Sequence, residues 1–179
     1  MMTMKLNVMK KPSRYIVLDT CIFQHFAEKE LGLAVINILR QAVNIDYGIA
    51  VSDFSFFELL DGASVEKEID RIKAVGATKR FWVKKNVLIA AAHLGCLYSK
   101  DGIPDKQINP GDKVIAATAL LTNSIIYTTN GRDFPRPFFR ELAQIPLWYK
   151  KNDRTICLMS YYLETDTNYI VSKYNERNL

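Results

Sequence analysis

The sequence predicts an α/β sandwich built around a mostly parallel sheet. Short apolar runs at 14–18, 48–51 and 124–128 have the length and composition of buried strands. Apolar residues recur with helical spacing between these runs, as at 32–44 and 86–97. The alternation of buried strands with helices is typical of α/β proteins with parallel sheets.

Further segments extend this pattern along the chain. We expect helices over 21–27, around 56–59, over 65–78 and from 112 onward, and strands over 81–83 and 155–163. Pro137 could begin another helix that carries Arg140, because proline is favoured in a first helical turn. We divide the chain into a basic lead-in at 1–13, one main domain at 14–146, and a C-terminal extension at 147–179 that packs on the same domain.

The composition is that of one folded domain. The 179 residues are 49% hydrophobic and 24% charged, with a net charge of +5 and a pI near 9.0. The three cysteines are widely spaced and there are two histidines, which argues against a disulfide framework and a structural zinc site. We expect a cytoplasmic protein with no membrane span, and the basic excess fits a polyanionic partner.

Four acids are placed where ligands gather in α/β proteins. Asp19 and Asp133 follow predicted strands, while Glu58 and Asp112 lie near helix starts. Ligands of open α/β sheets bind at the carboxyl ends of the strands, so all four acids could converge on one edge. Carboxylates crowded into one pocket repel one another and usually imply a cation such as Mg²⁺ or Mn²⁺.

Each acid also has a simpler structural explanation. Asp19 could cap the helix that follows it, and Glu58 could complete a capping box with Ser55. Asp112 suits the positive end of a helix, and Asp133 suits a turn. The sequence leaves these alternatives open.

Four segments together resemble one known family. They are Tyr-Ile-Val-Leu-Asp-Thr at 15–20, Val51-Ser52 through Phe-Glu-Leu at 57–59, Gly-Asp-Lys-Val-Ile-Ala-Ala-Thr-Ala at 111–119, and Thr-Thr-Asn-Gly-Arg-Asp-Phe at 128–134. In order and approximate spacing they are similar to the motifs of the PIN-domain nuclease family, either its VapC-like toxins or related RNA-processing ribonucleases.

The resemblance implies a three-layer α/β/α sandwich and an endoribonuclease that uses Mg²⁺ or Mn²⁺. The catalytic and metal-binding residues it implies are Asp19, Glu58, Asp112 and Asp133. Asn130 would support this site as a polar ligand, and Thr128 would orient waters or carboxylates near the substrate. The expected partners are RNA and a second copy of the chain in a homodimer. If the chain is the toxin of a toxin–antitoxin pair, a possible antitoxin protein is a further partner. The alternative is a catalytically degenerate module that binds nucleic acid or protein.

Two basic clusters are further candidates for binding RNA. Arg132, Arg136 and Arg140 could contact substrate phosphates, although a solvated basic surface explains them about equally well. Lys79-Arg80 and Lys84-Lys85 flank Phe81-Trp82, and interleaved basic and aromatic residues can stack on bases. The alternative is that these rings belong to the core of a strand.

Overall fold

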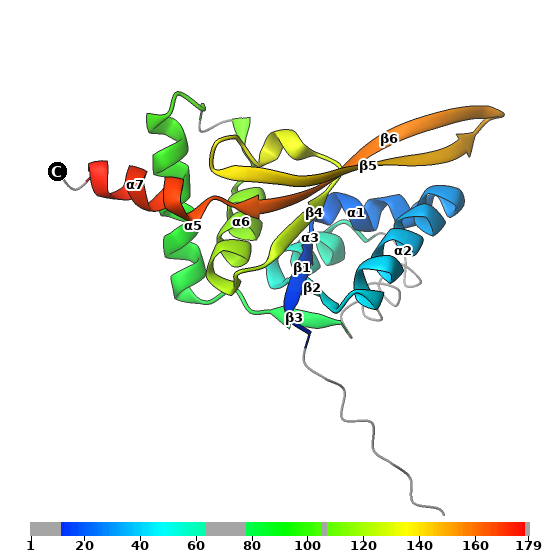
Figure 1. Cartoon of the computed structure of the whole chain (residues 1–179), viewed down its shortest axis with the longest axis horizontal. Helices are drawn as coiled ribbons and strands as arrows, with labels where there is room; N and C mark the ends of the chain where they lie inside the picture. The colour runs from blue at the N-terminus through cyan, green and yellow to red at the C-terminus, as the bar shows by residue number, and fades with distance from the viewer. Residues whose placement is uncertain (1–11, 64–77, 105–106, 178–179) are drawn as a thin grey trace, which may run out of the picture.

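The computed structural model describes residues 12–63, 78–104 and 107–177, whose strands form one six-stranded sheet in the order β3-β2-β1-β4-β6-β5 (Figure 1). The strands are β1 (Arg14–Leu18), β2 (Tyr47–Ser52), β3 (Lys79–Phe81), β4 (Ile125–Thr128), β5 (Phe139–Lys151) and β6 (Arg154–Thr165). The first four run parallel, whereas β6 is antiparallel to both β4 and β5. The predicted α/β fold with a mostly parallel sheet is confirmed.

Helices cover both faces of this sheet and give the fold three layers. A hydrophobic core lies on each face of the sheet, and alternate residues of β1 contribute to different cores. Ile16 and Leu18 pack in the first core, and Val17 packs in the second. The helices on the Ile16 side are α1 (Thr20–Gln24) and α2 (Lys29–Asn44), and those on the Val17 side are α5 (Lys85–Lys100), α6 (Pro110–Thr122) and α7 (Thr167–Arg177). The short helix α3 (Asp53–Asp61) contributes to both cores, because Phe56 packs in the first core and Phe54 packs against the second.

Most of the predicted elements are present within a few residues of their expected bounds. The helices expected over 32–44, over 86–97 and from 112 are α2, α5 and α6. The helix expected over 65–78 and the lead-in at 1–13 lie almost wholly outside the described residues. Within the described ranges, no helix has the length and apolar character needed to cross a bilayer.

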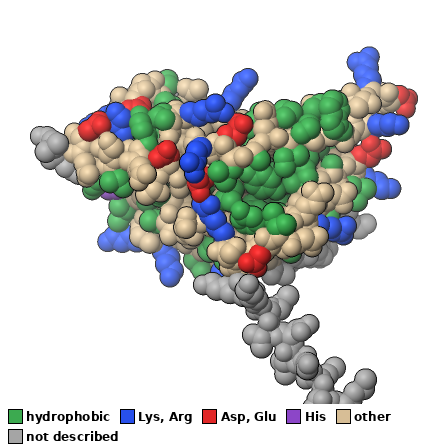
Figure 2. Space-filling model, in the orientation of Figure 1, with side chains coloured by type: hydrophobic (Ala, Val, Ile, Leu, Met, Phe, Trp, Pro, Cys, Tyr) green, Lys and Arg blue, Asp and Glu red, His purple; other side chains and the backbone are tan. Residues whose placement is uncertain are grey.

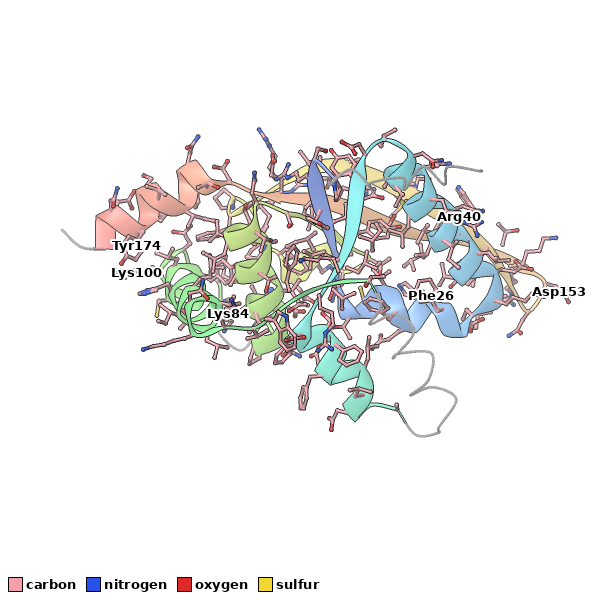
Figure 3. All side chains as sticks on the ribbon, turned by 90° about the horizontal axis from the view of Figure 1, so that it is seen from below. Phe26, Arg40, Lys84, Lys100, Asp153 and Tyr174 are labelled. Atoms are coloured by element: carbon pink, nitrogen blue, oxygen red, sulfur yellow. The ribbon has the colours of Figure 1, made fainter. Side chains whose placement is uncertain are left out.

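The C-terminal part forms a long hairpin that was only half predicted. The strand expected over 155–163 is confirmed as part of β6. The helix expected from Pro137 is wrong, because Arg140 lies in β5, which pairs with β6 along its length. The hairpin extends past the sheet over α2 to a tip near Asp153 (Figures 1 and 3). The domain boundary expected after residue 146 falls inside β5.

An apolar groove of about 280 Å³ lies between α2 and the hairpin. Its lining includes Ile38, Ile45 and Leu142, and Figure 2 shows hydrophobic side chains gathered on this face. Ile125, the first residue of β4, is also part of the lining. The groove therefore lies toward the amino ends of the parallel strands, away from the edge where the predicted acids lie.

Candidate active site

Four acidic side chains come together at the carboxyl edge of the parallel strands. Asp19 directly follows β1, and Glu58 lies on α3, the helix that follows β2. Asp112 occupies the first turn of α6, and Asp133 ends the short helix η3 (Gly131–Asp133) after β4. The charges of Asp133, Asp19 and Glu58 all act on the Asp112 carboxyl. The structure thus brings together the four acids that the sequence singled out.

Asp19 is buried, is held by two neighbouring side chains and does not cap a helix with its carboxylate. It is 3% exposed, and its Oδ2 accepts hydrogen bonds from Thr128 Oγ1 at 2.6 Å and Cys21 Sγ at 3.1 Å. Asp19 occupies the N-cap position of α1, but its side chain makes no capping hydrogen bond. Thr128 is fully buried, so its hydroxyl orients Asp19 from inside the protein.

Glu58 is oriented by Thr20, and the capping-box interpretation is wrong. Thr20 Oγ1 donates to Glu58 Oε2 at 2.6 Å. The N-cap of α3 is Ser52, whose Oγ accepts from the backbone N–H of Phe54 at 3.3 Å. Ser55 lies within the helix, and its buried hydroxyl has no hydrogen-bond partner among the described residues. The carboxylate of Glu58 therefore binds at the start of α1 and takes no part in capping its own helix.

Gly111 brings the start of α6 against Glu58. A Cβ at this position would lie 2.8 Å from Glu58 Oε1 and would also collide with the ring of Phe54. Only glycine allows this approach, because the space that a side chain needs is already filled. Asn109 caps α6 by accepting from the Gly111 N–H at 2.9 Å, and Asp112 lies in the first turn, at the positive end of the helix as expected.

Asp133 and Asn130 close the site from the β4 side. The side-chain amide of Asn130 donates to Asp133 Oδ2, and its backbone N–H donates to Thr128 Oγ1 at 2.8 Å. Asp133 also lies near Asp112, where its charge helps to raise the pKa of the Asp112 carboxyl. The turn explanation is therefore incomplete, because this carboxyl takes part in the acidic cluster.

The cluster carries unbalanced negative charge. Burial raises the pKa of Asp112 to about 8, and the charges of Asp133, Asp19 and Glu58 add to this effect. Burial and the charge of Asp19 likewise raise the pKa of Asp133. In the described part of the chain, no lysine or arginine forms an ion pair with any of the four acids.

A second layer of polar groups behind Asp19 was not predicted. Thr129 Oγ1 contacts both Cys21 Sγ at 3.3 Å and His25 Nε2 at 2.7 Å. Burial, followed by the charge of Asp19, raises the pKa of Cys21 to about 11, and burial lowers the pKa of His25. Both residues are therefore neutral near pH 7. Their closeness in sequence to Asp19 was the only available indication.

An open groove of about 450 Å³ adjoins the acidic cluster, between η3 and the hairpin. Arg132, Arg136 and Asn130 line it, so these predicted substrate-binding residues share one surface. Arg136 also pairs with Glu141, with 2.8 Å between the charged atoms. Arg140 is not part of the lining and pairs instead with Glu164 of β6.

The carboxylate oxygens of the cluster suit a hard divalent cation, although they are not arranged around one common point. All four acids offer carboxylate oxygens, which Mg²⁺ and Mn²⁺ prefer. Thr128 and Cys21 engage one oxygen of Asp19, and Thr20 engages one oxygen of Glu58, so each carboxylate keeps a second oxygen for a cation. In the described ranges, no three acidic, histidine or cysteine side chains are spaced as ligands of one ion. Binding would require the carboxyls to turn toward it.

Comparisons with known proteins identify the family. Three solved structures share the fold: VapBC2 from Rickettsia felis bound to a promoter DNA fragment (TM-score 0.57, 18% identity, 67% of this chain and 90% of that chain covered), VapBC-1 from nontypeable Haemophilus influenzae (0.54, 20%, 67% and 90%), and DNA-bound VapBC from Salmonella typhimurium (0.51, 23%, 69% and 92%). A search of curated proteins found no match. The model of the PIN domain matches residues 16–138, a range that holds all four acids. This chain therefore belongs to the PIN domain family, whose members are generally nucleases.

Proposed function

We propose that this chain is a metal-dependent endoribonuclease that hydrolyses RNA phosphodiester bonds with Mg²⁺ or Mn²⁺. The observation that carries the proposal is the cluster of four carboxylates, contributed by separate elements and lacking a cationic partner among the described side chains. Such a cluster is costly for folding, and a cation offsets that cost while supplying catalysis. Membership of the PIN domain family supports the same activity.

The acids would act as the ligands of the cation. When bound, the metal would lower the pKa of a water molecule and offset negative charge on the phosphoryl group. Asp19, Glu58 and Asp112 are its proposed principal ligands, and Asp133 is the fourth. Thr128 and Thr20 keep the first two carboxylates in fixed orientations, so less reorganisation is needed when substrate arrives.

The groove beside η3 would receive the RNA backbone. Arg132 and Arg136 line it and are exposed, so their guanidinium groups can reach phosphate oxygens. Such contacts would position the strand without reading its sequence. Asn130 lies between this groove and Asp133 and would connect substrate binding with the acidic cluster.

We also propose that an antitoxin protein regulates this nuclease. The support is the likeness in fold to three chains solved as VapBC complexes. A small neighbouring reading frame whose product copurifies with this chain and inhibits cleavage would agree with a toxin. An RNA-processing enzyme would have no such neighbour, and its expression would not arrest growth.

The test is a cleavage assay on labelled structured RNA and single-stranded DNA, with Mg²⁺, Mn²⁺ or EDTA. We expect cleavage that requires a metal, prefers RNA and is lost in Asp112→Asn. Asp61→Asn is the matched control, because this acid is exposed at the end of α3 and lies outside the cluster. Equal cleavage by wild type and Asp112→Asn would overturn the proposal. Absence of cleavage together with absence of metal-induced stabilisation would favour a degenerate binding module.

A further inference from the structure

We propose that Trp82 stacks on a base of single-stranded RNA that runs along the carboxyl edge of the sheet into the acidic site. This inference rests on the proposed nuclease function, since it assigns the path by which the substrate reaches the carboxylates. Trp82 is 65% exposed, although it directly follows a strand. The alternative that this ring belongs to the strand core is wrong for Trp82, while its neighbour Phe81 does pack against the core.

Trp82 lies on the same edge as the acids. It directly follows β3, just as Asp19 directly follows β1. β2 lies between these two strands, and both pairings are parallel, so the two strand ends face the same side. With neighbouring strands about 4.8 Å apart, the ends of β1 and β3 are separated by roughly 10 Å. At a rise of about 3.4 Å per stacked nucleotide, a few nucleotides cover that distance.

Arg80 holds the Trp82 ring in place. Its guanidinium carbon lies 5.2 Å from the centre of Trp82 and 4.2 Å from the centre of Phe56. Arg80 is itself fixed by Asp53, which accepts from its Nε at 2.8 Å. Both anchors lie on α3, the helix that carries Glu58. The aromatic ring is thus ordered before substrate binds, which lowers the entropic cost of stacking.

The charge around Trp82 suits a polyanion. Lys79, Lys84 and Lys85 flank the ring in sequence and are exposed (Lys84 is labelled in Figure 3). Among the described side chains, no carboxylate forms an ion pair with any of these three lysines. Grooves that bind single strands combine such cations for the backbone with aromatic rings for the bases. An exposed aromatic on a basic surface therefore favours a single strand over an apolar protein partner.

The groove lined by Arg132 and Arg136 lies on the opposite side of the acids. The order of strands along the sheet is β3, β2, β1, β4 and then β6. Trp82 lies at the side of the sheet where β3 is the edge strand, and the groove lies beside β4 and β6. The acids lie between these two surfaces, so a strand that touches both must pass the carboxylates. This arrangement explains why Trp82 would contribute to binding without touching the reacting phosphate.

The first experiment measures binding without cleavage. Fluorescence anisotropy of a labelled single-stranded RNA of about 12 nucleotides is recorded in EDTA. We expect Trp82→Ala to raise Kd by about 10-fold, within the range of about 5- to 150-fold that loss of one stacked base implies. Trp82→Phe should stay within about 3-fold of wild type, because it keeps an aromatic face. Trp148→Ala is the matched control, since Trp148 is 61% exposed on the hairpin, and we expect no change.

The second experiment needs no substitution at Trp82. The chain has two tryptophans, so Trp148→Phe leaves Trp82 as the only indole. Saturating single-stranded RNA should quench its emission, whereas an RNA duplex at equal concentration should not. Unchanged Kd in Trp82→Ala, or unchanged emission at saturation, would overturn the inference. Because neither measurement requires metal or cleavage, a failed nuclease assay would leave this result standing, and intact cleavage with unaltered binding would remove only the Trp82 assignment.

Discussion

Replacement of Asp112 by asparagine should stabilise the metal-free protein while it abolishes catalysis. The pKa of Asp112 is raised from 3.8 to about 8, first by burial and then by the surrounding acids. The folded chain therefore retains this proton between about pH 4 and pH 8, whereas the unfolded chain loses it. The stability that depends on the group is complete below about pH 4 and declines as pH rises toward 8.

The size of this effect follows from the shift. Roughly three pH units between the unfolded pKa and pH 7, at 1.36 kcal/mol each, set an upper limit of about 4 kcal/mol. Asp112 is only partly buried, and solvent screens part of the repulsion, so we expect about 1–2 kcal/mol. For a chain of this length, that corresponds to a Tm increase of about 3–6 °C in Asp112→Asn at pH 7.

Thermal unfolding in EDTA, followed by circular dichroism, measures the difference. Asp61→Asn controls for a general loss of negative charge and should leave Tm unchanged, because this side chain is exposed. The gain in Asp112→Asn should shrink as pH falls and disappear below about pH 3, where the carboxyl is protonated in both the folded and the unfolded state. Addition of Mg²⁺ should raise the Tm of wild type more than that of the variant. A variant that melts at or below wild type in EDTA would refute the electrostatic reasoning.

Three further changes test other parts of the structure. Thr20→Val removes the hydrogen-bond donor to Glu58 and should lower kcat by about 10-fold in steady-state kinetics, with Tm within a few degrees of wild type. An unchanged kcat would contradict the orienting role of Thr20. Gly111→Ala should cost about 1–3 kcal/mol, because the added methyl group meets Phe54, and urea denaturation measures this loss. We propose that the homodimer implied by the family resemblance forms through α5, where Leu88 is 52% exposed, so that Leu88→Glu should be monomeric when mass is measured by light scattering.

The parallel half of the sheet was predictable because its signals are local. A buried strand such as β1 is a continuous apolar run, and the acid that follows it is adjacent in sequence. The convergence of Asp19, Glu58 and Asp112 then follows from topology, since parallel strands present their carboxyl ends at one edge. Local pattern and a general rule of α/β folds are therefore sufficient to predict that these acids lie at one edge of the sheet.

The hairpin was harder to predict because two of its features conceal a strand. Pro146 argues against a central strand, but β5 lies at the edge of the sheet, where a missing N–H is tolerated. The pairing register shifts between Glu141 and Ala143, which interrupts the alternation of apolar and polar residues. The turn between the two strands contains Asn152 and Asp153, which both adopt positive φ, as residues of tight hairpin turns often do.

The supporting hydroxyls could not be recognised from sequence, because their role depends on contacts between distant segments. Thr128 reaches Asp19 across 109 positions, and Thr20 reaches Glu58 across 38. A threonine at the end of a strand has many possible structural roles, and only the packed structure selects one. These hydroxyls each bind a single carboxylate oxygen, so they fix direction without neutralising charge. Because the hydroxyls orient Asp19 and Glu58 without supplying positive charge, the acids still repel one another, as the proposed cation site requires, and yet keep defined orientations.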